Sequence, residues 1–133
     1  MRLLLDTHVW IWSQQDPGRL GTRTQGMLVA RDHESFVSSM STLELARLVA
    51  VGAIVPSITL QEWVERSIEA LQARTLDVSH AVAIEAYALP EPFHKDPADR
   101  VLVSTARCHD LTMVTADERI LAYPGVRTRD ARR

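Results

Sequence analysis

Short continuous apolar runs alternate along the chain with stretches in which apolar residues recur at helical spacing. Residues 2–9 are almost unbroken aliphatic sequence, which predicts a strand buried on both faces. A loop is expected over residues 14–21, where Pro17 and Gly18 stand. A helix is predicted over 22–30, a second short strand over 35–40, and a helix that begins at Ser41 and ends near Gly52.

The second half of the chain continues the alternation of helices and strands. Helices are predicted over residues 60–73, 79–89, 97–108 and 117–121, a strand over 111–115 and a last edge strand over 126–128. Trp10 and Trp12 would share one face if the first strand continues to them. This order predicts an α/β layer fold with a parallel sheet and right-handed crossovers.

Composition narrows the class of protein without defining a function. The 133 residues fit a single domain over 1–133, and 46% hydrophobic with 24% charged residues is typical of a globular chain. No apolar run is long enough for a membrane span, and a secretory signal is not expected. The single cysteine, Cys108, favours a reducing compartment, the cytoplasm. With a net charge of −2, any contact with nucleic acid must be local.

Carboxylates follow the predicted strands or begin the predicted helices. Asp6 ends the first apolar run, Glu44 lies in the first turns of the helix after the second strand, and Asp117 follows the strand 111–115. Asp96 and Asp99 stand at the start of the helix over 97–108. Ligands of parallel sheets bind beyond the carboxyl ends of the strands, so these side chains are expected to converge on one small pocket.

Each acid also has a purely structural interpretation. Ser41 to Glu44 fits a capping box, Asp96 before Pro97 fits an N-cap, and Asp6 fits a turn at a strand end. If the acids converge, however, each close pair repels by roughly 3–4 kcal/mol at an effective dielectric of 20, whereas a helix terminus returns only about 0.3–1 kcal/mol. Protonation or a bound cation must then reduce this repulsion. A site whose ligands are all oxygen atoms favours Mg²⁺ or Mn²⁺.

Four segments carry a resemblance to a known family. In order they read LLLDTHVWIW, SSMSTLELARLVAVGAI, LPEPFHKDPADRVLVSTA and LTMVTADERI, and together they resemble PIN-domain ribonucleases, specifically VapC-like toxins of type II toxin–antitoxin systems. The resemblance implies a three-layer PIN-like α/β fold with a central, mainly parallel sheet flanked by helices. It also implies a catalytic, metal-binding quartet formed by Asp6, Glu44, Asp99 and Asp117.

The resemblance further implies a Mg²⁺-dependent endoribonuclease, with Mn²⁺ as the alternative ion, acting on RNA such as tRNA or rRNA. It implies a cognate VapB-like antitoxin as partner and a homodimer. Relatives commonly carry a tryptophan before the helical glutamate and a lysine four residues after it, where this chain has Leu43 and Leu48. Arg47 is the candidate for the missing charge.

Four further residues are candidates for supporting the site or for binding substrate. Asp96 is expected to cap its helix or to support the ligands, and the Thr115 hydroxyl to hydrogen-bond a carboxylate. Arg100 pairs with a neighbouring acid or binds a phosphate, two readings of equal weight. His8 is expected to bond the backbone or line the pocket, and His94 in its proline-flanked loop is a candidate for RNA contact.

Other functional classes remain open on the sequence. A non-toxin PIN-type nuclease and a non-catalytic metal-binding module would use the same acids. A phosphatase of the haloacid-dehalogenase type would use the first aspartate as nucleophile, but it normally needs a second aspartate two residues on, and His8 stands there. The metal-activated hydrolysis of an RNA phosphodiester is the reading that uses the whole acidic set.

Overall fold

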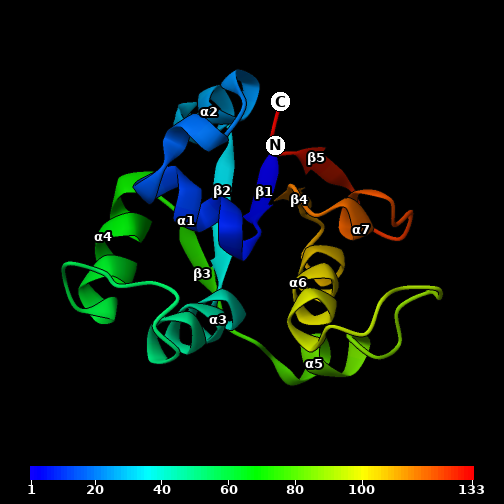
Figure 1. Ribbon diagram of the computed structural model, residues 1–133. Helices are drawn as coiled ribbons and strands as arrows, with labels where there is room; N and C mark the ends of the chain where they lie inside the picture. Colours follow the sequence, from blue (N-terminus) through cyan, green and yellow to red (C-terminus); the bar gives the residue numbers. More distant parts are fainter.

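The computed structural model describes residues 1–133 and contains a five-stranded parallel sheet with helices on both faces (Figure 1). The strand order is β3-β2-β1-β4-β5, so the first strand lies at the centre of the sheet. The elements are β1 (Arg2–Leu5), α1 (Thr7–Gln15), the 3₁₀ turn η1 (Pro17–Arg19), α2 (Thr22–Val29), β2 (Glu34–Ser38), α3 (Ser39–Ala50), α4 (Leu60–Leu71), β3 (Arg74–Leu76), α5 (His80–Glu85), α6 (Pro97–Cys108), β4 (Thr112–Thr115), α7 (Glu118–Leu121) and β5 (Thr128–Asp130).

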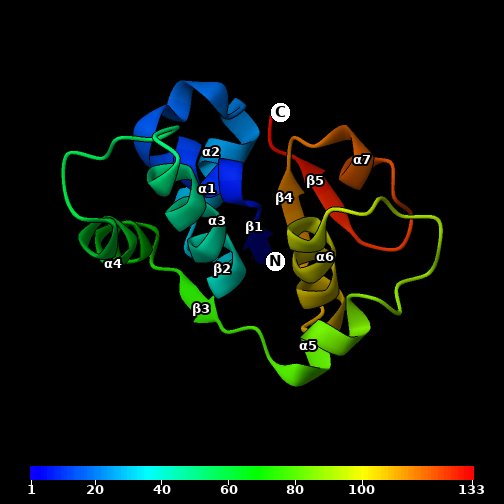
Figure 2. The same ribbon diagram turned by 60° about the horizontal axis from the view of Figure 1, so that its bottom comes forward.

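Two apolar clusters lie on opposite faces of the sheet and make the fold three-layered. Leu3 and Leu5 of β1 pack in one cluster with Trp10 of α1 and Trp63 of α4. Leu4 points the other way and packs in the second cluster, to which helices α6 and α7 contribute. Figure 2 shows α1 to α4 on one side of the sheet and α5 to α7 on the other. The predicted three-layer α/β fold is confirmed, and every strand pairing is parallel.

The first predicted strand was too long. It ends at Leu5, and the chain turns at Asp6 directly into helix α1. Asp6 has extended backbone angles and its side chain accepts the Thr7 N–H, so it is the N-cap of this helix. Because a buried strand runs without a glycine or proline into a helix that also buries Val9 and Trp10, the apolar run alone does not mark the change. The loop expected from residue 14 also begins later, after Gln15.

Helix α1 overturns the expected placement of the two tryptophans on one strand face. Trp10 is fully buried and its indole N–H donates to the Ser67 hydroxyl at 2.8 Å. Trp12, two residues on, instead lies against the Arg19 guanidinium, with 4.3 Å between the guanidinium carbon and the ring centre. The indoles thus have separate roles, one inside the core and one at its edge.

The remaining predicted elements are present with bounds that differ by a few residues, and the structure adds one strand that was not predicted. Helix α3 begins at Ser39, two residues before the predicted start, and its N-cap is Ser38. Strand β3 was not predicted, because its three residues are mostly exposed and form an edge of the sheet. Strand β5 lies over Thr128–Asp130 and not over 126–128. None of the helices has the length and apolar character needed to cross a bilayer.

Candidate metal centre

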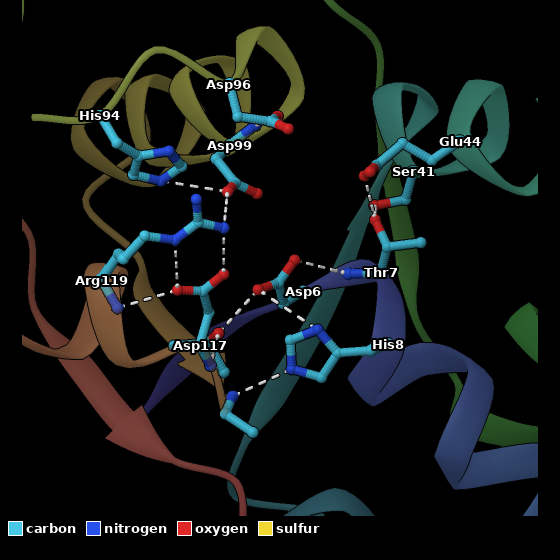
Figure 3. Close-up of polar contacts among 12 residues, drawn as sticks. Asp6, Thr7, His8, Ser41, Glu44, His94, Asp96, Asp99, Asp117 and Arg119 are labelled. Carbon is cyan, nitrogen blue, oxygen red and sulfur yellow. Dashed lines mark hydrogen bonds and ion pairs between the residues drawn. The ribbon is translucent and has the colours of Figure 1, made fainter.

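The acidic side chains named from the sequence gather at the carboxyl ends of the central strands (Figure 3). Asp6 follows β1, Glu44 lies one turn into α3 after β2, and Asp117 follows β4. Asp99 is in the first turn of α6. Figure 3 shows these side chains close together, and after burial the negative charges of Asp6, Asp96, Asp117 and Glu44 raise the pKa of Asp99. The predicted convergence is therefore present.

Asp6 is held by hydrogen bonds on both carboxylate oxygens. Oδ1 accepts the Thr7 backbone N–H at 2.8 Å, and Oδ2 accepts the Thr115 hydroxyl at 2.6 Å. Thr115 is itself buried, and its oxygen accepts the Asp117 backbone N–H at 3.0 Å. The predicted hydrogen bond from Thr115 to a carboxylate is present at Asp6, and Thr115 also contacts the backbone N–H of Asp117. The Asp6 carboxylate has little freedom to rotate.

His8 bridges the loop after β4 and the end of β1. Its Nε2 accepts the Ala116 backbone N–H at 2.9 Å, so the ring carries its proton on Nδ1 in the neutral form. That Nδ1 lies 3.6 Å from Asp6 Oδ2. The prediction that His8 would bond the backbone and line the pocket agrees with this geometry.

Glu44 is bound by hydroxyl groups, and Thr7 is a residue that the sequence reading missed. The Thr7 hydroxyl donates to Glu44 Oε1 at 2.5 Å and lies 2.9 Å from the Ser41 hydroxyl. The capping box predicted for Ser41 and Glu44 is wrong, because Ser38 caps α3 and leaves Ser41 free to face Thr7. Burial raises the pKa of Glu44, the Thr7 hydrogen bond opposes this, and the charge of Asp6 adds to it.

Asp96 and Asp99 take different parts at the start of α6. Asp96 caps the helix, since its Oδ1 accepts the Asp99 N–H at 3.0 Å, which agrees with the capping reading. Asp99 points into the site. Burial, followed by the charges of its acidic neighbours, raises the pKa of Asp99 to about 7. A carboxyl that titrates near neutrality is typical of functional sites.

His94 lies beside Asp99 and faces the cluster. Its Nε2 is 3.1 Å from Asp99 Oδ2, yet this buried nitrogen makes no well-aligned hydrogen bond. Burial and then the positive charge of Arg119 lower the pKa of His94. The lowered pKa disfavours a positive charge on His94 beside the acids.

Arg119 is the second residue that the sequence reading missed. Its guanidinium contacts Asp117 through Nε at 3.4 Å and a terminal nitrogen at 3.1 Å, and the same nitrogen is 3.7 Å from Asp99 Oδ2. Burial would raise the pKa of Asp117, but the side-chain and backbone hydrogen bonds from Arg119 outweigh it and the pKa is lowered. The signal in the sequence was an arginine two residues after the acid.

Arg100 lies outside this cluster and is committed to the fold. It is buried, donates to the carbonyl oxygens of Ala86, Phe93 and His94, and pairs with Glu91 at 2.8 Å. The ion-pair alternative from the sequence is the one that the geometry supports. Its guanidinium holds the proline-rich loop before α6, which carries His94, against the helix.

The donor set suits a hard divalent cation. All four acids are oxygen ligands, no cysteine is near, and Mg²⁺ commonly takes one or two carboxylates and several waters. No three histidine, cysteine or acidic side chains lie close enough to enclose one ion as they are now oriented. Thr7 holds Glu44 on one side of Asp6, and Arg119 holds Asp117 on the other (Figure 3). The residues fit the ion by chemistry, and a full set of ligands requires side-chain movement.

The fold and this acidic site define the class of protein. The family model described as the PIN domain matches residues 3–126, and the chain belongs to this family. Ribonuclease VapC22 of Mycobacterium tuberculosis is 35% identical over 121 residues, which are 91% of each chain. The family that the sequence motifs suggested is confirmed.

Solved structures agree on the fold. VapBC2 from Rickettsia felis, bound to a DNA fragment from its promoter, matches with a TM-score of 0.72 over 97% of this chain and 98% of that one, at 16% identity. DNA-bound VapBC from Salmonella typhimurium matches with a TM-score of 0.69 over 98% of each chain, at 21% identity. At these identities the likeness supports the architecture only.

Proposed function

We propose that this protein is a Mg²⁺-dependent endoribonuclease and the toxin of a VapBC-type toxin–antitoxin system, with Mn²⁺ as an alternative ion. The observation that carries the proposal is the convergence of Asp6, Glu44, Asp99 and Asp117 at the carboxyl edge of the sheet in a chain of the PIN family. The similarity to Ribonuclease VapC22 supports RNA, such as tRNA or rRNA, as the substrate.

Asp6 and Asp99 are the principal ligands in this proposal. Asp6 is already oriented by Thr7 and Thr115. Burial and then the negative charges of its neighbours raise the pKa of Asp99 to about 7, and a bound cation would favour its ionised form. Asp117 completes the ligand set, and Glu44 orients the attacking water through the oxygen that Thr7 leaves free. A bound divalent ion supplies a more acidic water and stabilises charge on the phosphate.

RNA cleavage by the purified protein tests the assignment of the acids. We expect cleavage with Mg²⁺, none with EDTA, and a loss of at least about 100-fold in Asp6→Asn, which keeps the shape of the side chain but not its charge. Glu62→Gln is the matched control, because Glu62 is an exposed acid on α4 and away from the site. Equal cleavage by wild type and Asp6→Asn would exclude Asp6 from the chemistry.

A VapB-like antitoxin is the proposed partner, and a homodimer the proposed state of the toxin. The support is that structural relatives of this chain are VapBC complexes. Induced expression is expected to arrest growth, whereas Glu44→Gln or co-expression of the antitoxin relieves the arrest. Arrest by wild type and Glu44→Gln alike would remove the link between toxicity and the acidic site. Cys108 carries a free, exposed thiol, which is consistent with the reducing cytoplasm.

A further inference from the structure

Arg119 is the one permanently charged cation within 4 Å of any acid of the quartet. The other two basic contacts come from histidines, His8 beside Asp6 and His94 beside Asp99. Arg119 therefore supplies the one positive charge in contact with these acids that does not depend on the protonation of a histidine, and it comes from the short helix that Asp117 caps.

The Arg119 guanidinium lies between two of the acids, Asp99 and Asp117. One terminal nitrogen is 3.1 Å from Asp117 Oδ2 and 3.7 Å from Asp99 Oδ2, as Figure 3 shows. A cation held by Asp99 and Asp117 would need these same two oxygens, which the nitrogen now contacts. Arg119 and such a cation would therefore compete for the two carboxylates.

Nothing else holds the arginine side chain in this position. It is 61% exposed and makes no hydrogen bond or ion pair beyond those to Asp117 and Asp99. Arg100, by contrast, is buried with four partners and is fixed. The Arg119 side chain can turn into solvent at the cost of its contacts with these two acids alone.

We propose that Arg119 is an intramolecular counter-ion, which occupies the cation position between Asp99 and Asp117 in the metal-free protein and sets the metal affinity by competing for it. The inference rests on the proposed function, since it assumes that the acids bind a divalent ion. Displacement of the Arg119 guanidinium would free Oδ2 of Asp117 for a cation, while Oδ1 would keep its hydrogen bond from the Arg119 backbone N–H. Arg119 is in this sense a positioning residue.

A Mn²⁺ titration of the purified protein tests the competition without any RNA. We expect Arg119→Gln to bind Mn²⁺ about tenfold more tightly than wild type, because it removes both the competing contact and a repelling charge. Arg66→Gln is the control: Arg66 is 70% exposed and pairs with Glu62 at 3.5 Å on α4. Its affinity should match that of wild type.

A second measurement on the wild-type protein separates displacement from a charge effect at a distance. The hydrogen exchange of the Arg119 Nε–H, followed by NMR, should accelerate at least about tenfold when Mg²⁺ saturates the site, whereas that of Arg66 should not change. Equal Mn²⁺ affinity of wild type and Arg119→Gln, or an Arg119 Nε–H still protected at saturating Mg²⁺, would overturn the inference and leave the proposed function intact. Failure of both proteins to bind Mn²⁺ or Mg²⁺ would overturn both.

Discussion

Threonine hydroxyl groups hold two acids of this site, Asp6 and Glu44. One of these threonines directly follows an acid in the sequence, and the other ends a strand. Thr115 lies at the end of β4 and holds Asp6, while Thr7 follows Asp6 and reaches across to Glu44 on α3. These contacts join segments more than thirty residues apart. A carboxylate that is held in this way keeps its orientation before any ligand arrives.

Removal of the Thr7 hydroxyl tests whether its contacts with Glu44 and Ser41 stabilise the fold. Thr7→Val keeps the shape of the side chain and leaves Glu44 and Ser41 without their shared partner, which should lower the free energy of unfolding by roughly 1–3 kcal/mol. The pKa of Glu44 should rise further, because the lost hydrogen bond lowers it in the wild type. Urea unfolding in EDTA measures the stability. Thr7→Ser retains the hydroxyl and is the control; a loss equal to that of Thr7→Val would show that the methyl group, not the hydrogen bond, matters.

Some residues of the site could be predicted from the sequence, and others could not. Asp6, Glu44, Asp99 and Asp117 were predictable because acids at strand ends stand out against apolar sequence. Arg119 and Thr7 were not, because nothing in the local pattern tells which hydroxyl or cation faces an acid from another element. Only the packing of α1 against α3, and of α7 beside the start of α6, brings them into contact.

At the scale of elements, the acids lie in the site because they stand at or near the first residues of helices. Asp6, Asp96 and Asp117 are the N-caps of α1, α6 and α7. On the sequence the structural alternatives were a turn for Asp6 and a cap for Asp96; in the structure Asp6 and Asp117 cap their helices and also lie in the acidic cluster. A cap residue is fixed by the backbone N–H that it accepts, so helix starts at the sheet edge are positions where a carboxylate has a defined orientation.

Substitutions of Asp96 can separate two effects of this residue, the capping of helix α6 and the negative charge near Asp99. Asp96→Ala should lower the free energy of unfolding by about 0.5–2 kcal/mol because it removes the N-cap, whereas Asp96→Asn keeps an oxygen for the Asp99 N–H and should cost less. Both variants should lower the pKa of Asp99, since the charge of Asp96 is one of its causes. Urea unfolding and carboxyl NMR titration measure the two effects. Equal destabilisation by both variants would contradict a capping role.

The ends of helices and strands were predictable where a proline, a glycine or a run of polar residues marked them. Pro97 and the acids around it fixed the start of α6, which runs over the predicted residues. The junction of β1 and α1 carries no such mark, because both elements bury their apolar residues and the chain turns on Asp6 alone. The three-residue β3 has too few residues to show a period, and only its pairing with β2 defines it.

Repulsion among the acids makes the stability of the whole molecule depend on pH and on metal. The Asp99 pKa of about 7 lies above its value of about 3.9 in an unfolded chain, so the folded state binds the proton more tightly between these values. The contribution of Asp99 to stability is therefore largest below about pH 4 and is lost as the pH rises to 7. The loss amounts to at most about 4 kcal/mol, at about 1.4 kcal/mol per pKa unit.

Thermal unfolding in EDTA between pH 4 and 8 measures this effect. Wild type should lose stability relative to Asp99→Asn as the pH rises, because the variant carries no charge at this position. Mg²⁺ should restore the wild type above pH 7 and act weakly on the variant, since an ion that binds the folded state stabilises it. A difference between the two proteins that stays constant with pH would show that the acids do not interact as described.

The order of the strands was less predictable than their direction. The alternation of elements implied a parallel sheet, and the strand ends implied a shared edge, so the architecture and the place of the site followed from the pattern. Strand order depends on which hydrophobic faces pack across the sheet, and those contacts join residues distant in sequence.

The chemistry of the RNA ends produced by the purified protein tests the central claim most directly. In the proposed reaction a water activated at the acidic site would attack the phosphodiester and leave 5′-phosphate and 3′-hydroxyl ends, whereas attack by the ribose 2′-hydroxyl would leave a 2′,3′-cyclic phosphate. We predict 5′-phosphate ends with Mg²⁺, no products with EDTA, and none with Asp99→Asn. Cyclic phosphate ends, or cleavage that persists in EDTA, would contradict a metal-dependent nuclease built on these carboxylates.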